Sequence, residues 1–252
     1  MIPLKTAEEI QIMREANRIV GEVLKELKRI IRPGINTSLL DRKAEEGIRK
    51  RGAIPAFKGY RGYPAVLCVS VNEEVVHGIP GRRILREGDI VSLDLGVKYR
   101  GFYGDAAVTL PVGKISEKAR KLLQTTRNAL YQAIEKAIVG NYLGDISWAI
   151  QSYVEKEGFQ VVRDFVGHGI GENLHEEPQI PNFGNPGTGP RLEEGMVLAI
   201  EPMVNEGTWE VKILEDGWTA VTLDGSLSAH FEHTVAVTRD GPYILSQEWE
   251  EE

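Results

Sequence analysis

The chain reads as two copies of one folding unit, and this duplication restricts its fold more than any other feature. Gly34, Leu40 and Gly52 recur in the same spacing as Gly140, Ile146 and Gly158. The run EGDIVSLD at 87–94 recurs as EGMVLAIE at 194–201, and DAAV at 105–108 recurs as EHTV at 232–235. Glu-Gly before a strand is a common turn pattern, so an accidental repeat is the alternative. Three segments in matching order argue against it.

Hydrophobic periodicity predicts the same elements in each half, two helices followed by strands. Thr6 and Glu9 form a capping box before the first helix. The expected helices cover 7–31, 38–52, 116–139 and 144–157, and the expected strands include 65–71, 196–201, 209–214, 217–222 and 231–238. An Asp216-Gly217 turn is expected to join the two middle strands of the second half. We therefore predict a single catalytic domain over 1–252, with halves at about 6–112 and 116–240 and a solvated acidic tail at 247–252.

Two acids lie on what reads as a β-hairpin between Glu87 and Leu110. With a turn centred between Tyr99 and Arg100, Asp94 faces Asp105 directly across the ladder, about 4.5–5.5 Å apart at Cβ. The neighbouring residues are apolar, and buried acids are rarely left unpaired, so a cation between them is expected. An exposed hairpin with two solvated Asp residues is the alternative.

The repeat predicts a second pair of acids, because Asp94 and Asp105 correspond to Glu201 and Glu232. A pseudo-twofold axis between the halves brings all four carboxylates to one point, where they cannot all ionise without cations. Two divalent ions about 3.5–4 Å apart would neutralise them, with Asp105 and Glu232 as natural bridges.

The chain has five histidines, and His168 is the best candidate for a nitrogen ligand. Its glycine neighbours would let a bulky partner approach the imidazole. One imidazole among carboxylates suits Mn, Fe, Co or Zn better than Mg or Ca. His230 and His233 are interpreted as structural, and His233 is expected to point away from Glu232 because neighbouring strand residues alternate faces.

Composition excludes several classes of protein. The net charge of −7 over 252 residues argues against binding to a phosphate backbone. The single cysteine, Cys68, cannot form an internal disulfide, which fits a reducing cytoplasm. The first residues do not resemble a signal peptide, and no apolar run is long enough to cross a bilayer. We expect a cytoplasmic protein without membrane contact.

In order and spacing, Asp94, Asp105, His168, Glu201 and Glu232 resemble the metal ligands of type I methionine aminopeptidases. The flanking segments agree from the first helix to about residue 246, including VSVNEEVVHGIP, YGDAAVTLPVG, VGHGIGENLHEEPQIPNFG and FEHTVAVT. The chain is similar to the compact bacterial form, without an N-terminal extension or the type II insertion. The resemblance implies the α+β pita-bread fold, a pseudo-twofold antiparallel sheet backed by helices.

The resemblance also implies an activity, the removal of the initiator methionine from nascent polypeptides with a small second residue. Asp94 would bind one metal ion, His168 and Glu201 the other, and Asp105 and Glu232 both. Glu201 would also move a proton, while the family's two substrate-contacting histidines match His77 and His175. The methionine pocket is carried over to Tyr60, Tyr63, Cys68 and Trp218, with Phe57 and Leu174 as further wall positions.

Other features of the family are expected with it. Two divalent ions, chosen from Co, Mn, Fe, Zn or Ni, are implied, together with a monovalent cation near Asn72, Glu74 and Ser228. A monomer with transient ribosome contact is expected. A proline-specific peptidase shares the five-ligand pattern and is the rival enzyme, while a binding module or a metal-free creatinase-type hydrolase should have lost metal ligands.

Overall fold

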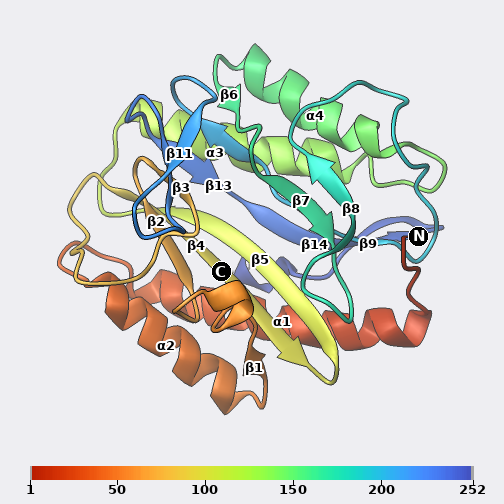
Figure 1. The fold of residues 1–252 in the computed structure, drawn as a ribbon, viewed down its shortest axis with the longest axis horizontal. Helices are drawn as coiled ribbons and strands as arrows, with labels where there is room; N and C mark the ends of the chain where they lie inside the picture. The colour runs from red at the N-terminus through yellow and green to blue at the C-terminus, as the bar shows by residue number, and fades with distance from the viewer. Residues whose placement is uncertain (1, 251–252) are drawn as a thin grey trace.

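A nine-stranded antiparallel sheet forms the centre of the molecule, and two pairs of helices pack against it (Figure 1). The computed structural model describes residues 2–250. The sheet follows the order β1-β4-β5-β14-β9-β7-β8, with β2 added to β4 and β15 added to β14. This is the expected α+β pita-bread architecture, and the central pair β5–β14 joins the two halves of the chain.

The bounds of the elements are as follows. The helices are α1 (Ala7–Ile30), α2 (Thr37–Lys50), α3 (Glu117–Ile134) and α4 (Leu143–Lys156), with short 3-10 turns at Tyr60–Gly62 and Gln247–Trp249. The strands are β1 (Ile54–Pro55), β2 (Cys68–Val71), β3 (Glu74–Val76), β4 (Ile90–Tyr99), β5 (Phe102–Pro111), β6 (Gln160–Val161), β7 (Val166–Gly169), β8 (Glu176–Pro181), β9 (Val197–Ile200), β10 (Met203–Asn205), β11 (Val211–Ile213), β12 (Ala220–Thr222), β13 (Ser228–His230), β14 (Glu232–Thr238) and β15 (Gly241–Ile244).

The duplication read from the sequence is visible as a pseudo-twofold relation. The repeat that aligns 105–108 with 232–235 places Ala106 on His233, and these two residues are direct cross-strand partners. The approximate axis therefore passes between β5 and β14. Two isolated β-bridges, Asn36 to Ile84 and Tyr142 to Arg191, occupy equivalent positions in the two halves. Figure 1 shows the helix pairs α1–α2 and α3–α4 at opposite ends of the sheet.

The helices cover the face of the sheet that does not carry the acids. Thr6 and Glu9 form the expected capping box of α1, which packs against β4 and β5. Asn17 is fully buried in α1, where its side-chain oxygen accepts a hydrogen bond of 3.2 Å from the Asp105 N–H. His233 faces the other way from Glu232, as expected, and contacts Tyr131 of α3. Each helix pair thus supports the strand that carries the acid of its half.

The hairpin differs from the expected register by two positions. The turn is formed by Arg100 and Gly101, both with positive φ (49° and 93°), as a two-residue type I′ turn requires. Asp94 consequently pairs with Ala107, and Asp105 pairs with Gly96. The prediction that Asp94 directly faces Asp105 is wrong. The two acids are diagonal neighbours on one face of the sheet, still close enough for their side chains to interact.

Other boundaries shift because tertiary contacts replace local signals. The strand expected at 65–71 begins only at Cys68, and α3 ends at Ile134 rather than near 139. Residues 247–250, expected to be solvated, instead pack on the molecule. Trp249 is buried, and Glu250 pairs with Arg127. Residues 251–252 of that predicted tail lie outside the described residues. Within 2–250, no helix combines the length and the apolar character needed to cross a membrane.

Candidate metal centre

Five elements each bring one of the predicted ligands to a common cavity. Asp94 comes from β4, Asp105 from β5, His168 from β7 and Glu232 from β14, while Glu201 follows the last residue of β9. The cavity has a volume of about 250 Å³ and is lined by all five side chains. Residues from both halves of the chain therefore meet at one place, as the duplication predicts.

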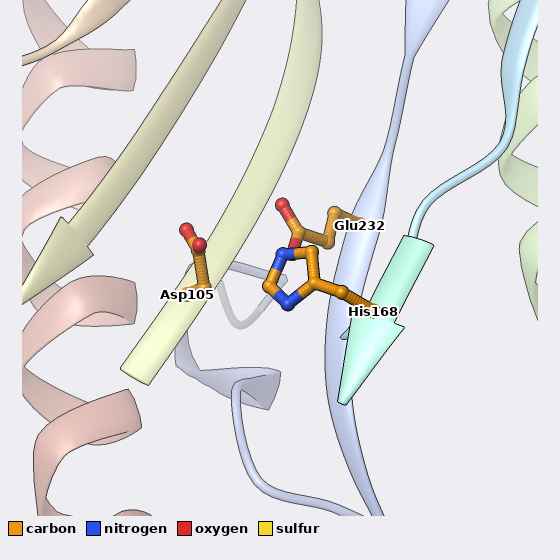
Figure 2. A group of neighbouring side chains, drawn as sticks. All are labelled: Asp105, His168 and Glu232. Carbon is orange, nitrogen blue, oxygen red and sulfur yellow. The ribbon is translucent and has the colours of Figure 1, made fainter. Parts of the chain in front are cut away.

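Three of these side chains, from β5, β7 and β14, point into one common space (Figure 2). One ligand atom each from Asp105, His168 and Glu232 lies within 4.8 Å of the other two. Glu201 joins the group through its Oε1, which is 3.6 Å from His168 Nε2. These separations are compatible with oxygen and nitrogen donors that share metal ions, because each donor–metal bond is about 2 Å long.

The register of the sheet explains how the acids converge. Asp94 and Glu232 are both cross-strand partners of Ala107, one on each side of β5. The small methyl group of Ala107 therefore lies between two carboxylates on the same face. Cys68 continues this row as the partner of Asp94 on β2. A larger side chain at position 107 would occupy the space into which the two acids project.

The electrostatics of four buried acids in one cavity are unfavourable, which supports a cation site. Burial raises the pKa of Glu201 to about 8 and that of Asp94 to about 7. Burial, and then the neighbouring carboxylates, raise the pKa values of Asp105 and Glu232 well above their ordinary range. Buried oxygens of Asp94, Asp105 and Glu232 have no hydrogen-bond partner among the described residues. Such orphaned oxygens fit divalent metal ions.

His168 presents a free nitrogen to this group. Its Nδ1 lies 2.9 Å from the carbonyl of Gly169, so Nδ1 carries the proton and donates it, leaving the Nε2 lone pair for a metal. Burial lowers its pKa to about 4, which keeps the ring neutral. The flanking glycines are required by close backbone contacts within the sheet, not by a partner that approaches the imidazole. A Cβ on Gly167 would lie 2.4 Å from the Ala199 carbonyl oxygen, and one on Gly169 would lie 2.1 Å from that of Glu177.

His77 and His175 line the same cavity. His77 has a left-handed backbone (φ 60°), a conformation that is rare outside glycine and concentrates at functional sites. The His175 ring lies 4.3 Å from that of His168, and its Nδ1 lies 2.7 Å from the Tyr60 hydroxyl oxygen. Burial lowers the pKa of His77 to about 4 and that of His175 to about 3, so both rings are neutral near pH 7.

The predicted pocket residues form the apolar wall of the cavity. Tyr60, Tyr63, Cys68 and Trp218 all line it, as do Phe57 and Leu174. The rings of Tyr63 and Trp218 meet edge to face at 5.2 Å, and the Tyr63 hydroxyl donates to the Gly78 carbonyl at 2.9 Å. Burial raises the pKa of the Cys68 thiol, with Asp94 as the next cause, so the thiol is protonated and unsuited to act as a nucleophile.

The expected monovalent-cation residues also lie near one another. The Ser228 N–H donates to the Asn72 carbonyl oxygen at 2.9 Å, and Glu74 opens strand β3 just after Asn72. Asn72 has a left-handed backbone (φ 58°) in the turn between β2 and β3. A cation bound by these carbonyls stays a prediction.

Sequence reasoning missed several residues in and beside the site. Phe165 and Met203 line the cavity, and Phe165 packs edge to face on His77 at 5.4 Å. Neither carries a sequence signal that separates it from core residues. His230 was interpreted as structural, yet its Nε2 lies 3.4 Å from Glu201 Oε2. Its position two places before Glu232 is the signal that puts it on the same side of the chain.

Comparison with known proteins decides the family. Residues 11–239 match the family model of metallopeptidase family M24. A methionine aminopeptidase of Clostridium perfringens is 59% identical over 246 residues, covering 98% of this chain and 99% of the relative. Methionine aminopeptidase 1 of Bacillus subtilis is 57% identical, covering 98% and 100%. The chain belongs to the methionine aminopeptidases of family M24. It is accordingly a metallopeptidase, a hydrolase that binds divalent metal.

Solved structures agree with this assignment to the methionine aminopeptidases. That of a methionine aminopeptidase from Thermotoga maritima has a TM-score of 0.96 at 52% identity, covering 98% of this chain and 99% of that one. A prolidase from Pyrococcus furiosus has a TM-score of 0.79 at 25% identity, with 96% of this chain but 65% of that chain covered. The rival proline-specific enzymes therefore share the fold and are much more distant in sequence.

Proposed function

We propose that this chain removes N-terminal methionine from polypeptides whose second residue is small. The observation that carries the proposal is the convergence of Asp94, Asp105, His168, Glu201 and Glu232 on one cavity, beside an aromatic wall. The relatives at 59% and 57% identity are named for the same activity. A metal centre next to an apolar pocket fits a hydrolase that recognises one apolar side chain.

A set of four carboxylates and one imidazole is best matched by two divalent ions. Asp94 would hold one ion, His168 and Glu201 the other, and Asp105 and Glu232 would contact both. When bound, such ions polarise a carbonyl group and lower the pKa of water. The donor set of mixed oxygen and nitrogen suits Co, Mn, Fe, Zn or Ni, and does not choose among them.

The chain's own residues supply proton transfer and charge stabilisation. Glu201, buried and flanked by imidazoles, would take a proton from the attacking water and pass it to the leaving amine. The Tyr60 hydroxyl would donate to Nδ1 of neutral His175, which leaves the His175 proton on Nε2. That N–H would then donate to the oxygen that becomes negative in the transition state. His77 would lie near the scissile nitrogen.

The aromatic wall would select the substrate. Buried Tyr63 and Cys68, together with half-buried Trp218, would form a largely apolar surface that suits the unbranched, polarisable side chain of methionine. The free α-amino group of the substrate would bind a carboxylate or a metal ion, which restricts cleavage to the first residue. Nascent polypeptides are the corresponding source of substrate.

A peptide assay tests the reaction. We expect Met-Ala-Ser to lose its methionine, an Xaa-Pro peptide to remain intact, and a chelator to stop the first reaction. Cleavage of the Xaa-Pro peptide alone would assign a proline-specific peptidase instead. Elemental analysis of protein purified without added metal, followed by reconstitution with each candidate ion, measures the number and identity of the ions.

The role of His175 has its own test. If it donates to the oxyanion, His175→Ala lowers kcat by about 10²-fold or more with a much smaller change in KM. Steady-state kinetics on Met-Ala-Ser measure both constants. A rise in KM with an unchanged kcat would reassign His175 to ground-state binding of the substrate. A monomeric state, a cytoplasmic location and transient ribosome contact stay predictions.

A further inference from the structure

His230 is a buried histidine beside the metal centre that has no role in the mechanism above. Only 2% of its surface is exposed, and its Nε2 has no hydrogen-bond partner within residues 2–250. A buried polar atom without a partner is costly, and most such atoms in proteins are paired. An unpaired nitrogen in this position therefore calls for an explanation.

A carboxyl oxygen of Glu201 lies close to this nitrogen. His230 Nε2 lies 3.4 Å from Glu201 Oε2, while His168 Nε2 lies 3.6 Å from Glu201 Oε1. The two carboxylate oxygens thus each face one imidazole. A movement of a few tenths of an ångström would bring the His230 contact into the range of about 2.7–3.2 Å of an N–H···O hydrogen bond.

The backbone of His230 is rigidly held. Thr109 Oγ1 accepts from the His230 N–H and donates to the His230 carbonyl oxygen, both at 2.8 Å. Thr109 is itself 2.8 Å from the Ser92 hydroxyl on β4. Glu201, in contrast, follows the end of β9 and has a long side chain with several rotatable bonds. A fixed donor beside a flexible carboxylate can set its orientation.

We propose that His230 is a positioning residue that donates an Nε2–H hydrogen bond to Glu201 Oε2 and thereby directs Glu201 Oε1 toward the metal centre with His168. Hydrogen bonds to a ligating carboxylate fix its orientation, and their loss weakens metal binding about 10- to 100-fold. This inference rests on the proposed role of Glu201 as a metal ligand. It assigns the residue that holds that ligand in place.

The test compares substitutions at position 230 that differ in whether the new side chain can place an N–H group beside Glu201. Gln at position 230 can place an N–H where His Nε2 lies, whereas the shorter Asn and the apolar Ala cannot. We expect His230→Gln to bind Mn²⁺ within about threefold of the unchanged chain, and His230→Asn and His230→Ala to lose about 10- to 100-fold in affinity. Calorimetric titration of the metal-free proteins measures this without any turnover.

His233→Gln is the matched control, because His233 is equally buried but faces the helices and Ser246. It should lower the melting temperature and leave Mn²⁺ affinity within about threefold. Equal affinities for all His230 variants would overturn the proposal. Gln binding as weakly as Ala, with an altered Co²⁺ absorption spectrum, would also overturn it and make His230 a direct ligand. If the unchanged chain bound no metal, the proposed function itself would fail.

Discussion

The two halves of the chain carry equivalent acids in different registers. In the first half β4 and β5 form a closed hairpin, where Asp94 is opposite Ala107 and Asp105 is displaced by two positions. In the second half Ile200 pairs with His233, and the Phe231 N–H donates to the Pro202 carbonyl. Glu201 therefore lies directly opposite Glu232. The equivalent pair of acids is diagonal in one half and opposed in the other.

This difference shows how an approximate repeat can build an asymmetric site. Like charges that face each other directly across a ladder are destabilising, so the Glu201–Glu232 pair also favours a cation site. The connection between Glu201 and Glu232 also contains β10 to β13 and the loops between them, which supply Met203, Trp218 and His230 to the cavity or its border. The first half has a two-residue turn at the equivalent place. The hairpin of the first half is thus the more regular framework around the acids, whereas the second half carries an insertion whose side chains reach the cavity.

The largest expected effect comes from removing the acids that lie next to the pseudo-twofold axis. Asp105→Ala and Glu232→Ala should each lower kcat/KM by about 10³-fold or more, because each removes a carboxylate that, in the proposed function, would contact both ions and support the metal's charge stabilisation. Peptide hydrolysis and metal content measure the loss. Glu117→Ala removes an exposed acid from the first turn of α3 and should leave both unchanged. Retained activity in Glu232→Ala would contradict the shared role of the two halves.

The next effect distinguishes the two faces of β5. Ala107→Leu places a large side chain between Asp94 and Glu232, and it should weaken Mn²⁺ binding at least about tenfold while costing about 1–3 kcal/mol of stability through overpacking. Ala106→Leu points to the helix-covered face and should cost similar stability with metal affinity retained. Urea unfolding and calorimetry measure the two quantities. Equal losses of metal affinity in both variants would show that the cross-strand row does not define the site.

The metal-free protein should become less stable as the pH rises. Glu201 and Asp94 have folded-state pKa values of about 8 and about 7, above the ordinary carboxyl range of about 4 in the unfolded chain. The folded state therefore holds more protons, and its stability is full below about pH 4 and is lost as the pH rises through about 7 to 8. The buried histidines have lowered pKa values and act in the opposite direction below about pH 6.5. Melting temperatures measured from about pH 7 to pH 8, with and without Mn²⁺, therefore test the contribution of the acids. A metal-free protein that gains stability over this range would contradict the electrostatic account of the four acids.

The smallest effect concerns the contact between the halves. The Thr234 hydroxyl on β14 donates to the Asp105 carbonyl oxygen on β5 at 2.7 Å. Thr234→Val keeps the shape and removes this bond, so the free energy of unfolding should fall by about 1 kcal/mol. Urea unfolding measures the change. Thr238→Val is the matched control, because it removes an equally short hydrogen bond, to the Gly241 carbonyl oxygen, that lies within one half of the chain. Loss of metal binding in Thr234→Val would show that this bond also holds the acids in position for the metal.

The duplication, the acids and the long amphipathic helices could be read from the sequence because they depend on local patterns. Thr6 and Glu9 cap α1 through contacts between neighbours, and the repeated acids reveal a shared point through their order alone. The prediction of a solvated tail was wrong for residues 247–250. Charge composition does not show that Trp249 packs on the fold, or that Arg14 and Arg127 pair with the glutamates of this segment.

The sequence alone predicted that the four acids belong together, because a duplicated order of elements fixes which strands must meet, and the family resemblance added His168 to them. Only the tertiary structure decided how they meet. The register followed from positive φ at Arg100 and Gly101, a conformational preference that shifts every pairing of the hairpin by two. The place of His230 beside Glu201 depends on Thr109, a residue from the other half that is distant in sequence. Long-range contacts of this kind leave no local pattern, so they can be found only after the chain has folded.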